Sequence, residues 1–190
     1  MHTPLTRFLD FFFAFCGLLC LAPLFLIIYV IGKLDTGHPI FRQERVGRNQ
    51  QPFILVKFRT MPVDTVSVAT HLVDANAVTR LGAFLRKTKL DELPQLINVL
   101  KGEMSLVGPR PCLFNQTDLL TERAAQGVLG ELPGITGLGQ INGVDMSTPV
   151  ALAHLEREMI DTFTLKAYFA YILQTAIGRG AGDRIKKSNS

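Results

Sequence analysis

The stretch Lys89-Leu90-Asp91-Glu92-Leu93-Pro94-Gln95-Leu96 places two adjacent carboxylates at the start of an apolar helical pattern. Two interpretations fit them. In the first, Thr88 caps a helix, Asp91 is the acidic member of a capping box, and Glu92 only favours the positive end of the helix dipole. In the second, the carboxylates belong to a site for a nucleotide diphosphate and a metal. Capping is the commoner use of such spacing, but one carboxylate can serve both purposes.

Length and composition bound the class of protein. The chain has 190 residues, which is one domain with room for a modest core. Its net charge of +4 suits anionic lipid or a phosphate-bearing substrate. We expect no nucleic-acid partner, because the chain has no Trp, no zinc-knuckle spacing and no aromatic-rich basic repeat. Cys16, Cys20 and Cys112 form no Cys-x-x-Cys pair, which indicates a reducing compartment without a disulfide framework.

The segment from Phe11 to Ile31 is uncharged and almost wholly apolar. At about 1.5 Å per residue, a helix of this length just reaches across a hydrocarbon core of roughly 30 Å. Pro23 lies inside it and predicts a kink, so the helix either spans the bilayer or re-enters the leaflet from which it came. The cations that follow place the C-terminal side in the cytoplasm by the positive-inside rule; they are Lys33, Arg42, Arg45, Arg48, Lys57 and Arg59.

A hairpin is expected from Pro39 to Met61, with turn residues at 47–49 and a β-rich run at 53–59. Lys57 and Arg59 share one face of the second strand, where they either bind a phosphate or form a solvated surface. The polar segment from Pro62 to Asn76 has no clear period and is interpreted as a mobile loop or lid.

Helical spacing returns at 78–87 and again from Leu93, where an apolar stripe of ordinary core type continues the helix that carries the carboxylates; its members are Leu93, Leu96, Ile97 and Leu100. Further along, Pro109 and Pro111 fix the backbone around Arg110, which lowers the entropy lost when its guanidinium grips a phosphate; an ordinary structural loop is the alternative.

Two more helices are expected near the C-terminus. One begins at Pro149 after the hydroxyl residues 147 and 148 and runs to about Phe163. The other, from Leu165 to Ile177, is too short to span a bilayer and belongs either to the core or to the membrane interface. Cations follow it that could meet anionic headgroups; they are Arg179, Arg184, Lys186 and Lys187.

Six sequence words, in their order and spacing, resemble the bacterial sugar transferases, a family of monotopic phosphoglycosyl transferases. They are Pro39-Ile40-Phe41, Lys57-Phe58-Arg59-Thr60-Met61, Leu90-Asp91-Glu92-Leu93-Pro94-Gln95, Asn98-Val99-Leu100-Lys101-Gly102-Glu103-Met104-Ser105, Val107-Gly108-Pro109-Arg110-Pro111 and Pro133-Gly134-Ile135-Thr136-Gly137. The resemblance implies a mainly α fold with a short β-hairpin and interfacial amphipathic helices. It implies a re-entrant membrane helix over residues 1–34 and a cytoplasmic catalytic domain over residues 35–190, on the inner bacterial membrane. Ala22-Pro23 stands where the family breaks this helix at Ser-Pro.

The resemblance also implies an activity: transfer of a sugar-1-phosphate from a UDP-sugar to undecaprenyl phosphate, with release of UMP. An N-acetylated hexosamine is the expected sugar. Asp91 would be the nucleophile, and Glu92 would bind Mg²⁺. The residues that would handle the phosphates or uridine are Lys57, Arg59, Arg86, Arg110 and its neighbour Pro111. Asp161 matches a family carboxylate late in the chain.

Physical chemistry supports the same scheme, since a carboxylate can attack a phosphoryl group and split one transfer into two steps. Mg²⁺ prefers one or two carboxylates plus phosphate oxygens. Two alternatives stay open. A membrane-anchored scaffold would not need adjacent carboxylates, and a glycosyltransferase that moves sugar without phosphate would release UDP. The chain lacks the Asp-x-Asp triplet common in the latter class. The oligomeric state is open, with a homodimer among the options.

Overall fold

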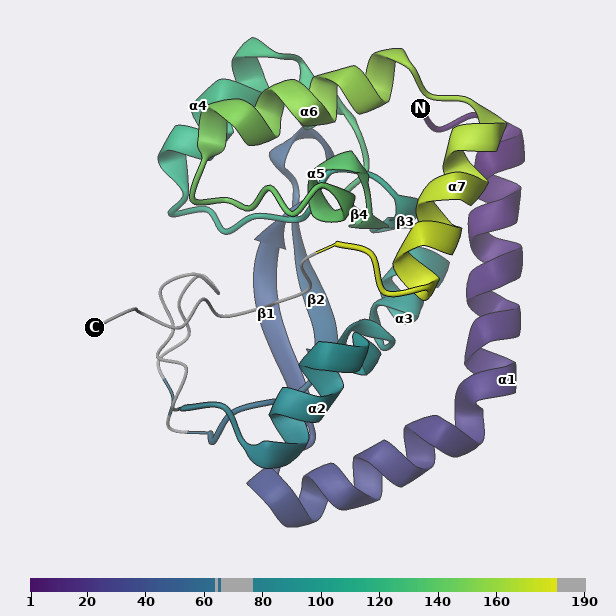
Figure 1. Ribbon diagram of the computed structural model, residues 1–190, viewed down its shortest axis with the longest axis vertical. Coiled ribbons are helices and arrows are strands. Elements are labelled where there is room, and N and C mark those ends of the chain that lie inside the picture. The colour runs from purple at the N-terminus through teal and green to yellow at the C-terminus, as the bar shows by residue number, and fades with distance from the viewer. Residues whose placement is uncertain (64, 66–76, 181–190) are drawn as a thin grey trace.

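The computed structural model describes residues 1–63, 65 and 77–180 (Figure 1). The lid expected at 62–76 therefore lies almost wholly outside the described residues, as do Arg184, Lys186 and Lys187. The principal elements are α1 (Pro4–Thr36), β1 (Ile40–Val46), η1 (Arg48–Gln50), β2 (Pro52–Phe58), α2 (Arg80–Thr88), η4 (Leu90–Glu92), α3 (Gln95–Leu100), β3 (Ser105–Val107), α4 (Thr117–Ala125), η5 (Val128–Gly130), β4 (Gly134–Thr136), α5 (Leu138–Ile141), α6 (Pro149–Asp161) and α7 (Leu165–Ala176).

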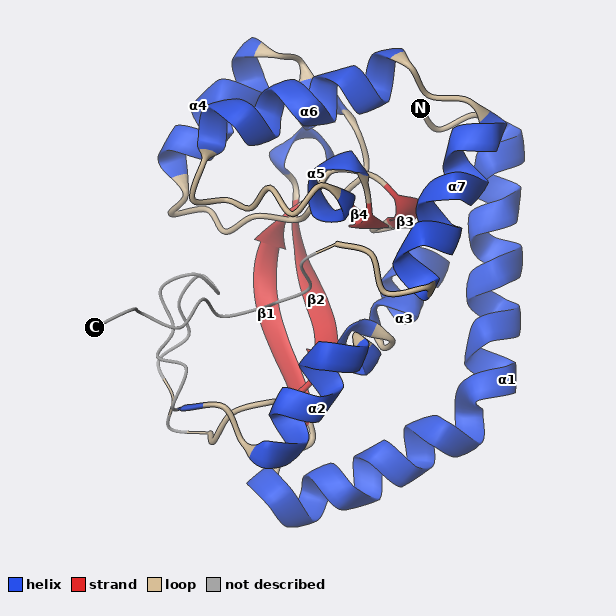
Figure 2. Ribbon diagram, viewed as in Figure 1, coloured by secondary structure: helices blue, strands red, loops and turns tan. Residues whose placement is uncertain are grey.

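Helices form most of the structure around one antiparallel hairpin (Figure 2). The hairpin joins β1 and β2, with Ile40 opposite Phe58 and Val46 opposite Pro52, which confirms the prediction for this segment. Phe53 and Leu55 on β2 are buried, while Ile54 between them is exposed, as the alternation of side chains in a strand requires. The mainly α fold with a short hairpin is thus confirmed.

Helix α1 is long and apolar enough to cross a membrane by length and composition. The Thr3 hydroxyl caps its first turn by accepting from the Thr6 amide at 3.2 Å, and Gly37 ends it in the left-handed conformation. Figure 1 shows a sharp bend between the half beside α7 and the half that passes below α2. Pro23 lies inside this helix, and an interior proline removes a backbone hydrogen bond and kinks the axis. The kink is confirmed; re-entry stays a prediction.

A second, parallel pair of strands was not foreseen. Ser105 of β3 lies opposite Gly134 of β4, and Val107 lies opposite Thr136. The strands approach so closely that a Cβ atom on Gly134 would collide with the backbone of Gly108. Glycine at position 134 therefore lets the proline–arginine loop after β3 lie directly against β4.

The first half of α1 is anchored to the rest of the protein by Asp10, which is fully buried. One Asp10 oxygen accepts hydrogen bonds from the Leu106 amide and the Tyr168 hydroxyl, both at 3.0 Å. The other accepts from Arg7 at 2.8 Å. A buried carboxylate is stable only with such partners, so Asp10 fixes α1 to β3 and α7.

The region of the carboxylates corrects two expectations. The Thr88 hydroxyl donates backward to the carbonyls of Phe84 and Leu85 in α2, so the capping-box interpretation is wrong. The carboxylates do not belong to the following helix either, because they lie in the separate turn η4 and α3 begins only at Gln95. In the expected core stripe, Leu96 is buried but Ile97 is 37% exposed.

Two C-terminal expectations are also refined. Helix α6 begins at Pro149 as predicted, but it ends at Asp161, two residues earlier than expected. Helix α7 contributes to the core, which confirms one of the two roles left open for it, and a position at the membrane interface stays a prediction. Tyr168 and Tyr171 are buried on its inner face, while Leu165, Phe169 and Leu173 are exposed on its outer face.

Candidate active site

Asp91 and Glu92 lie in the turn η4, between the end of α2 and the start of α3. Asp91 is 1% exposed and Glu92 is 6% exposed. Lys89, which leads into the turn, has a φ of 59°, a left-handed conformation that side chains other than glycine rarely adopt. Lys89 is the C-cap of α2, and a left-handed residue commonly ends a helix in this way. The two adjacent buried carboxylates that follow it form the centre of the candidate site.

Arg110 is brought to this centre from a different part of the chain. Its guanidinium donates to the Glu92 carboxylate at 2.8 Å, and the Glu92 side chain is 8% exposed. The carboxylate pair and the proline-framed arginine, which the sequence analysis assigned to one site, thus meet directly. A charge-assisted bond of this kind is shorter and stronger than a neutral hydrogen bond.

The backbone of Arg110 is held by a buried ion pair that the sequence analysis missed. Arg123 of α4 donates to the Arg110 carbonyl at 2.8 Å. It also makes two bonds to the Glu156 carboxylate of α6, at 2.7 and 2.5 Å. Glu156 in turn accepts a hydrogen bond from the backbone of Arg110. The Arg123–Glu156 pair therefore forms hydrogen bonds with both the carbonyl and the amide of the Arg110 main chain.

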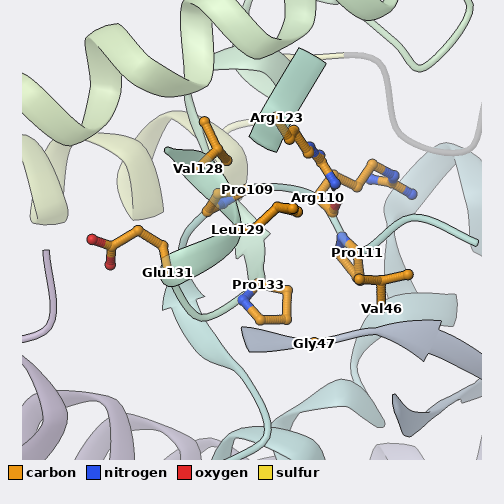
Figure 3. Close-up of a pocket in the computed structure, with 10 residues that line it drawn as sticks. All are labelled: Val46, Gly47, Pro109, Arg110, Pro111, Arg123, Val128, Leu129, Glu131 and Pro133. Atoms are coloured by element: carbon orange, nitrogen blue, oxygen red, sulfur yellow. Dashed lines mark hydrogen bonds between the residues drawn. The ribbon is translucent and has the colours of Figure 1, made fainter. Parts of the chain in front are cut away.

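Neighbouring groups complete this support. Arg45 of β1 donates to the Pro111 carbonyl at 3.2 Å. Arg110 and Arg123 lie beside a cavity of about 20 Å³, lined also by the prolines of the loop (Figure 3). Burial raises the pKa of Glu156 against the opposing attraction of Arg123, so the carboxylate depends on its guanidinium partner to stay charged. Burial likewise raises the pKa of the nearby Cys112 thiol, which keeps that thiol protonated and unreactive.

Three other predicted cations lie on β2, just after β2 and on α2. Lys57 is buried on β2, a strand that contacts η4. Arg86 lies in the last turn of α2, where it donates to the Thr60 hydroxyl at 2.9 Å. Arg59 donates to the His38 carbonyl at 2.8 Å. Lys57 and Arg59 both lie over the Phe41 ring, at 5.8 and 5.4 Å from its centroid, so they do share a face.

Asp161 has a different environment from the other predicted residues. It is exposed at the end of α6 and forms an ion pair with Arg157 of the same helix. It lines neither the cavity beside Arg110 nor the one beside Glu92. The structure therefore does not bring Asp161 to the carboxylates.

A metal ion would find only a partial set of protein ligands here. Within residues 1–63, 65 and 77–180, no three His, Cys, Asp or Glu side chains cluster in a way that could hold one. Asp91 and Glu92 supply two carboxylates at most. Two carboxylates fit the coordination of Mg²⁺, which commonly binds through one or two carboxylates, water and substrate phosphates.

The missed residues left a faint signal in the sequence. Arg123 follows Leu119 by one helical turn, and Glu156 lies on the same helix face as Leu152 and Met159. A charged residue at an apolar position of a helix is expensive to bury unless it has a partner. The pattern could therefore have indicated that Arg123 and Glu156 are each buried and paired. Nothing in it shows that they pair with each other across 33 positions.

Comparison with known proteins identifies the family of the chain. The family model described as bacterial sugar transferase matches residues 1–179. The chain is 40% identical, over 71% of its length and 73% of the relative's, to a putative undecaprenyl-phosphate N-acetylgalactosaminyl 1-phosphate transferase of Bacillus subtilis. It is 35% identical, over 89% of its length and 82% of the relative's, to the exopolysaccharide production protein ExoY of Sinorhizobium fredii.

A third relative is longer than this chain. An uncharacterized sugar transferase of Haemophilus influenzae is 39% identical over 77% of the chain, but that match covers only 35% of the relative. The protein belongs to the bacterial sugar transferase family.

Proposed function

We propose that the protein transfers a sugar-1-phosphate from a UDP-sugar to undecaprenyl phosphate and releases UMP. The observation that carries the proposal is the pair of buried adjacent carboxylates with the Arg110 guanidinium on Glu92. The name of the B. subtilis relative supports the acceptor and suggests an N-acetylated hexosamine as the sugar. The product would be a first lipid-linked intermediate for a surface polysaccharide or another glycoconjugate.

The proposed mechanism has two steps. In the first, an Asp91 oxygen attacks the phosphorus next to the sugar, the bond from that phosphorus to UMP breaks, and an aspartyl phosphosugar forms. In the second, a phosphate oxygen of the lipid attacks the same phosphorus, and the bond to Asp91 breaks. The carboxylate is thereby restored, and the sugar leaves on a polyprenyl diphosphate.

Charge neutralisation is the main demand of such a transfer. Mg²⁺, when bound with the donor diphosphate, would offset phosphate charge, and Glu92 is the side chain best placed to hold it. Arg110 lies at the same carboxylate and would exchange part of its contact with Glu92 for a phosphate oxygen. Lys57, Arg59 and Arg86 would supply further positive charge for the diphosphate or the uridine, while Pro111 stiffens the loop.

Attachment to the membrane would determine on which face the reaction takes place. The apolar α1 would anchor the protein, and its kink at Pro23 would return the chain to the cytoplasmic face by re-entry. The cations that follow α1 favour that face. Asp161 would contact substrate only after a rearrangement of its pair with Arg157.

The test is nucleotide release in nanodiscs that contain undecaprenyl phosphate and Mg²⁺, with a panel of UDP-sugars. UMP from one sugar, lost in Asp91→Asn and kept in Asp118→Asn, is the expected result. Asp118 is a matched control because it is an exposed aspartate on α4. Release of UDP would instead support a glycosyltransferase, and no release from any sugar would favour the scaffold.

A further inference from the structure

A pocket of about 220 Å³ lies beside Glu92 and is lined by residues from the end of α2 and from η4, α3, β3, β4 and α7. Most of its walls are aliphatic: they include Leu90, Leu93, Leu96, Leu106, Ile135 and Ile172. Its polar residues are few, and two of them, Thr136 and Thr175, satisfy each other through a hydroxyl–hydroxyl bond of 2.5 Å. The cavity therefore offers an apolar surface that ends at a catalytic carboxylate.

The charged end of the cavity is well defined. Glu92 lines it directly, and its carboxylate carries the Arg110 guanidinium. Lys89 lines the same end, and its ammonium donates to the Arg179 carbonyl just beyond α7 at 2.6 Å. A ligand with a phosphate joined to a hydrocarbon chain would meet cations at one end and aliphatic walls along the rest.

The apolar surface continues outside the cavity. Helix α7 forms one wall, and its outer face exposes Phe169 by 42% and Leu173 by 63%. The Phe169 ring contacts that of Phe13 on α1, with centroids 6.0 Å apart, so the exposed faces of α7 and of the membrane helix are joined. A hydrocarbon chain could thus pass from the bilayer around α7 to the carboxylates without crossing a broad polar surface.

We propose that this cavity binds the isoprene units next to the phosphate of the lipid acceptor. The inference rests on the proposed function, since it concerns the acceptor of that reaction. The phosphate of the acceptor must reach the phosphorus held on Asp91, and Glu92 is adjacent to Asp91. The chain attached to that phosphate therefore has to leave along the walls beside Glu92. An acyl chain of an ordinary phospholipid in the same place would exclude the acceptor.

The first test narrows the cavity at Ala176, an exposed residue at the end of α7 that contributes to its lining. Ala176→Phe should raise the KM for undecaprenyl phosphate roughly tenfold, as expected when about two methylene groups of chain lose their buried place. The release of UMP in a single turnover without lipid should not change. Ala151→Phe makes the same change at an exposed alanine of α6, outside the lining of this cavity, and is the matched control.

The outcomes separate the inference from the proposed function. An unchanged KM for the lipid in Ala176→Phe overturns the inference and leaves the activity intact. A fall of UMP release in the single turnover also overturns it, because the cavity would then serve the donor. Absence of UMP release from the wild-type protein contradicts the proposed function itself.

A second measurement does not depend on activity. A short isoprenoid phosphate that carries a photoreactive diazirine near its phosphate should label the cavity walls at Leu93 or Ile172, as located by mass spectrometry. Undecaprenyl phosphate should compete with the label, and an excess of phosphatidic acid should not. Labelling elsewhere, or equal competition by both lipids, overturns the inference.

Discussion

The buried pair Arg123–Glu156 yields a prediction that separates stability from positioning. Glu156 is fully buried and Arg123 is 4% exposed. Glu156→Leu removes the carboxylate and leaves a buried guanidinium without its charge partner, at a cost of about 3–5 kcal/mol. For a domain of this size each kcal/mol lowers the Tm by about 2–4 °C, so the expected fall is roughly 6–20 °C. The double variant Arg123→Met, Glu156→Leu removes both charges and should recover most of that loss.

Activity should behave differently from stability. In the wild-type protein, Arg123 donates to the Arg110 carbonyl at 2.8 Å. In the double variant neither replacement side chain can form this bond. Hydrogen bonds from charged groups contribute about 1.5–3 kcal/mol, so kcat for UMP release should fall about tenfold to a hundredfold, provided the bond acts in the transition state. Arg123→Lys keeps the charge but loses the planar fork that reaches Glu156 and the carbonyl together, and kcat should be intermediate.

The assay pairs thermal unfolding at one fixed scan rate with steady-state UMP release for the same four proteins. The expected pattern is a recovered Tm with an unrecovered kcat in the double variant. A double variant with both the Tm and the kcat of the wild-type protein would refute the argument, because Arg110 would then need no support from this pair. A double variant as unstable as Glu156→Leu would show that the pair's packing, and not its charge, is what matters.

Three further predictions concern other parts of the molecule. Tyr168→Phe removes one hydrogen bond to buried Asp10 and should cost about 1 kcal/mol, or a fall in Tm of about 2–4 °C; an unchanged Tm would show that this bond adds nothing. Burial lowers the pKa of His2 to about 4 from 6.5, so stability should decline as the pH falls from 6.5 toward 4, where the unfolded chain binds the extra proton. Denaturant midpoints across that range should fall less in His2→Gln, and parallel curves would contradict the assignment. Pro23→Leu should straighten α1. A cysteine introduced at the N-terminus should react with a maleimide from the cytoplasmic side when Pro23 is kept, and from the opposite side in Pro23→Leu. Reaction from the opposite side with Pro23 kept would exclude re-entry.

The features that the sequence predicted are those with a local physical cause. Pro23 kinks α1 whatever surrounds the helix, because the proline itself removes a backbone hydrogen bond. The alternation of side chains along 53–59 specifies the second strand of the hairpin. The family resemblance assigned Glu92 and Arg110 to one site, but it did not predict the direct bond between these residues, which are 18 positions apart.

The features that the sequence did not predict depend on contacts between distant segments. Strands β3 and β4 have three residues each, too few for an alternating pattern, and each exists because the other pairs with it. Asp10 is buried against Tyr168, which lies 158 residues away in the chain, and no local pattern indicates this contact.

In the proposed mechanism, Asp91 becomes covalently attached to the phosphosugar. This step is tested by rapid mixing of the protein in nanodiscs with its UDP-sugar and Mg²⁺, without lipid acceptor, when UMP and the intact protein mass are measured on the same quenched sample. We expect up to about one UMP per active protein and a mass increase equal to one phosphosugar, both absent in Asp91→Asn and present in Asp118→Asn. UMP that appears only after undecaprenyl phosphate is added, or a mass increase that persists in Asp91→Asn, would contradict the account.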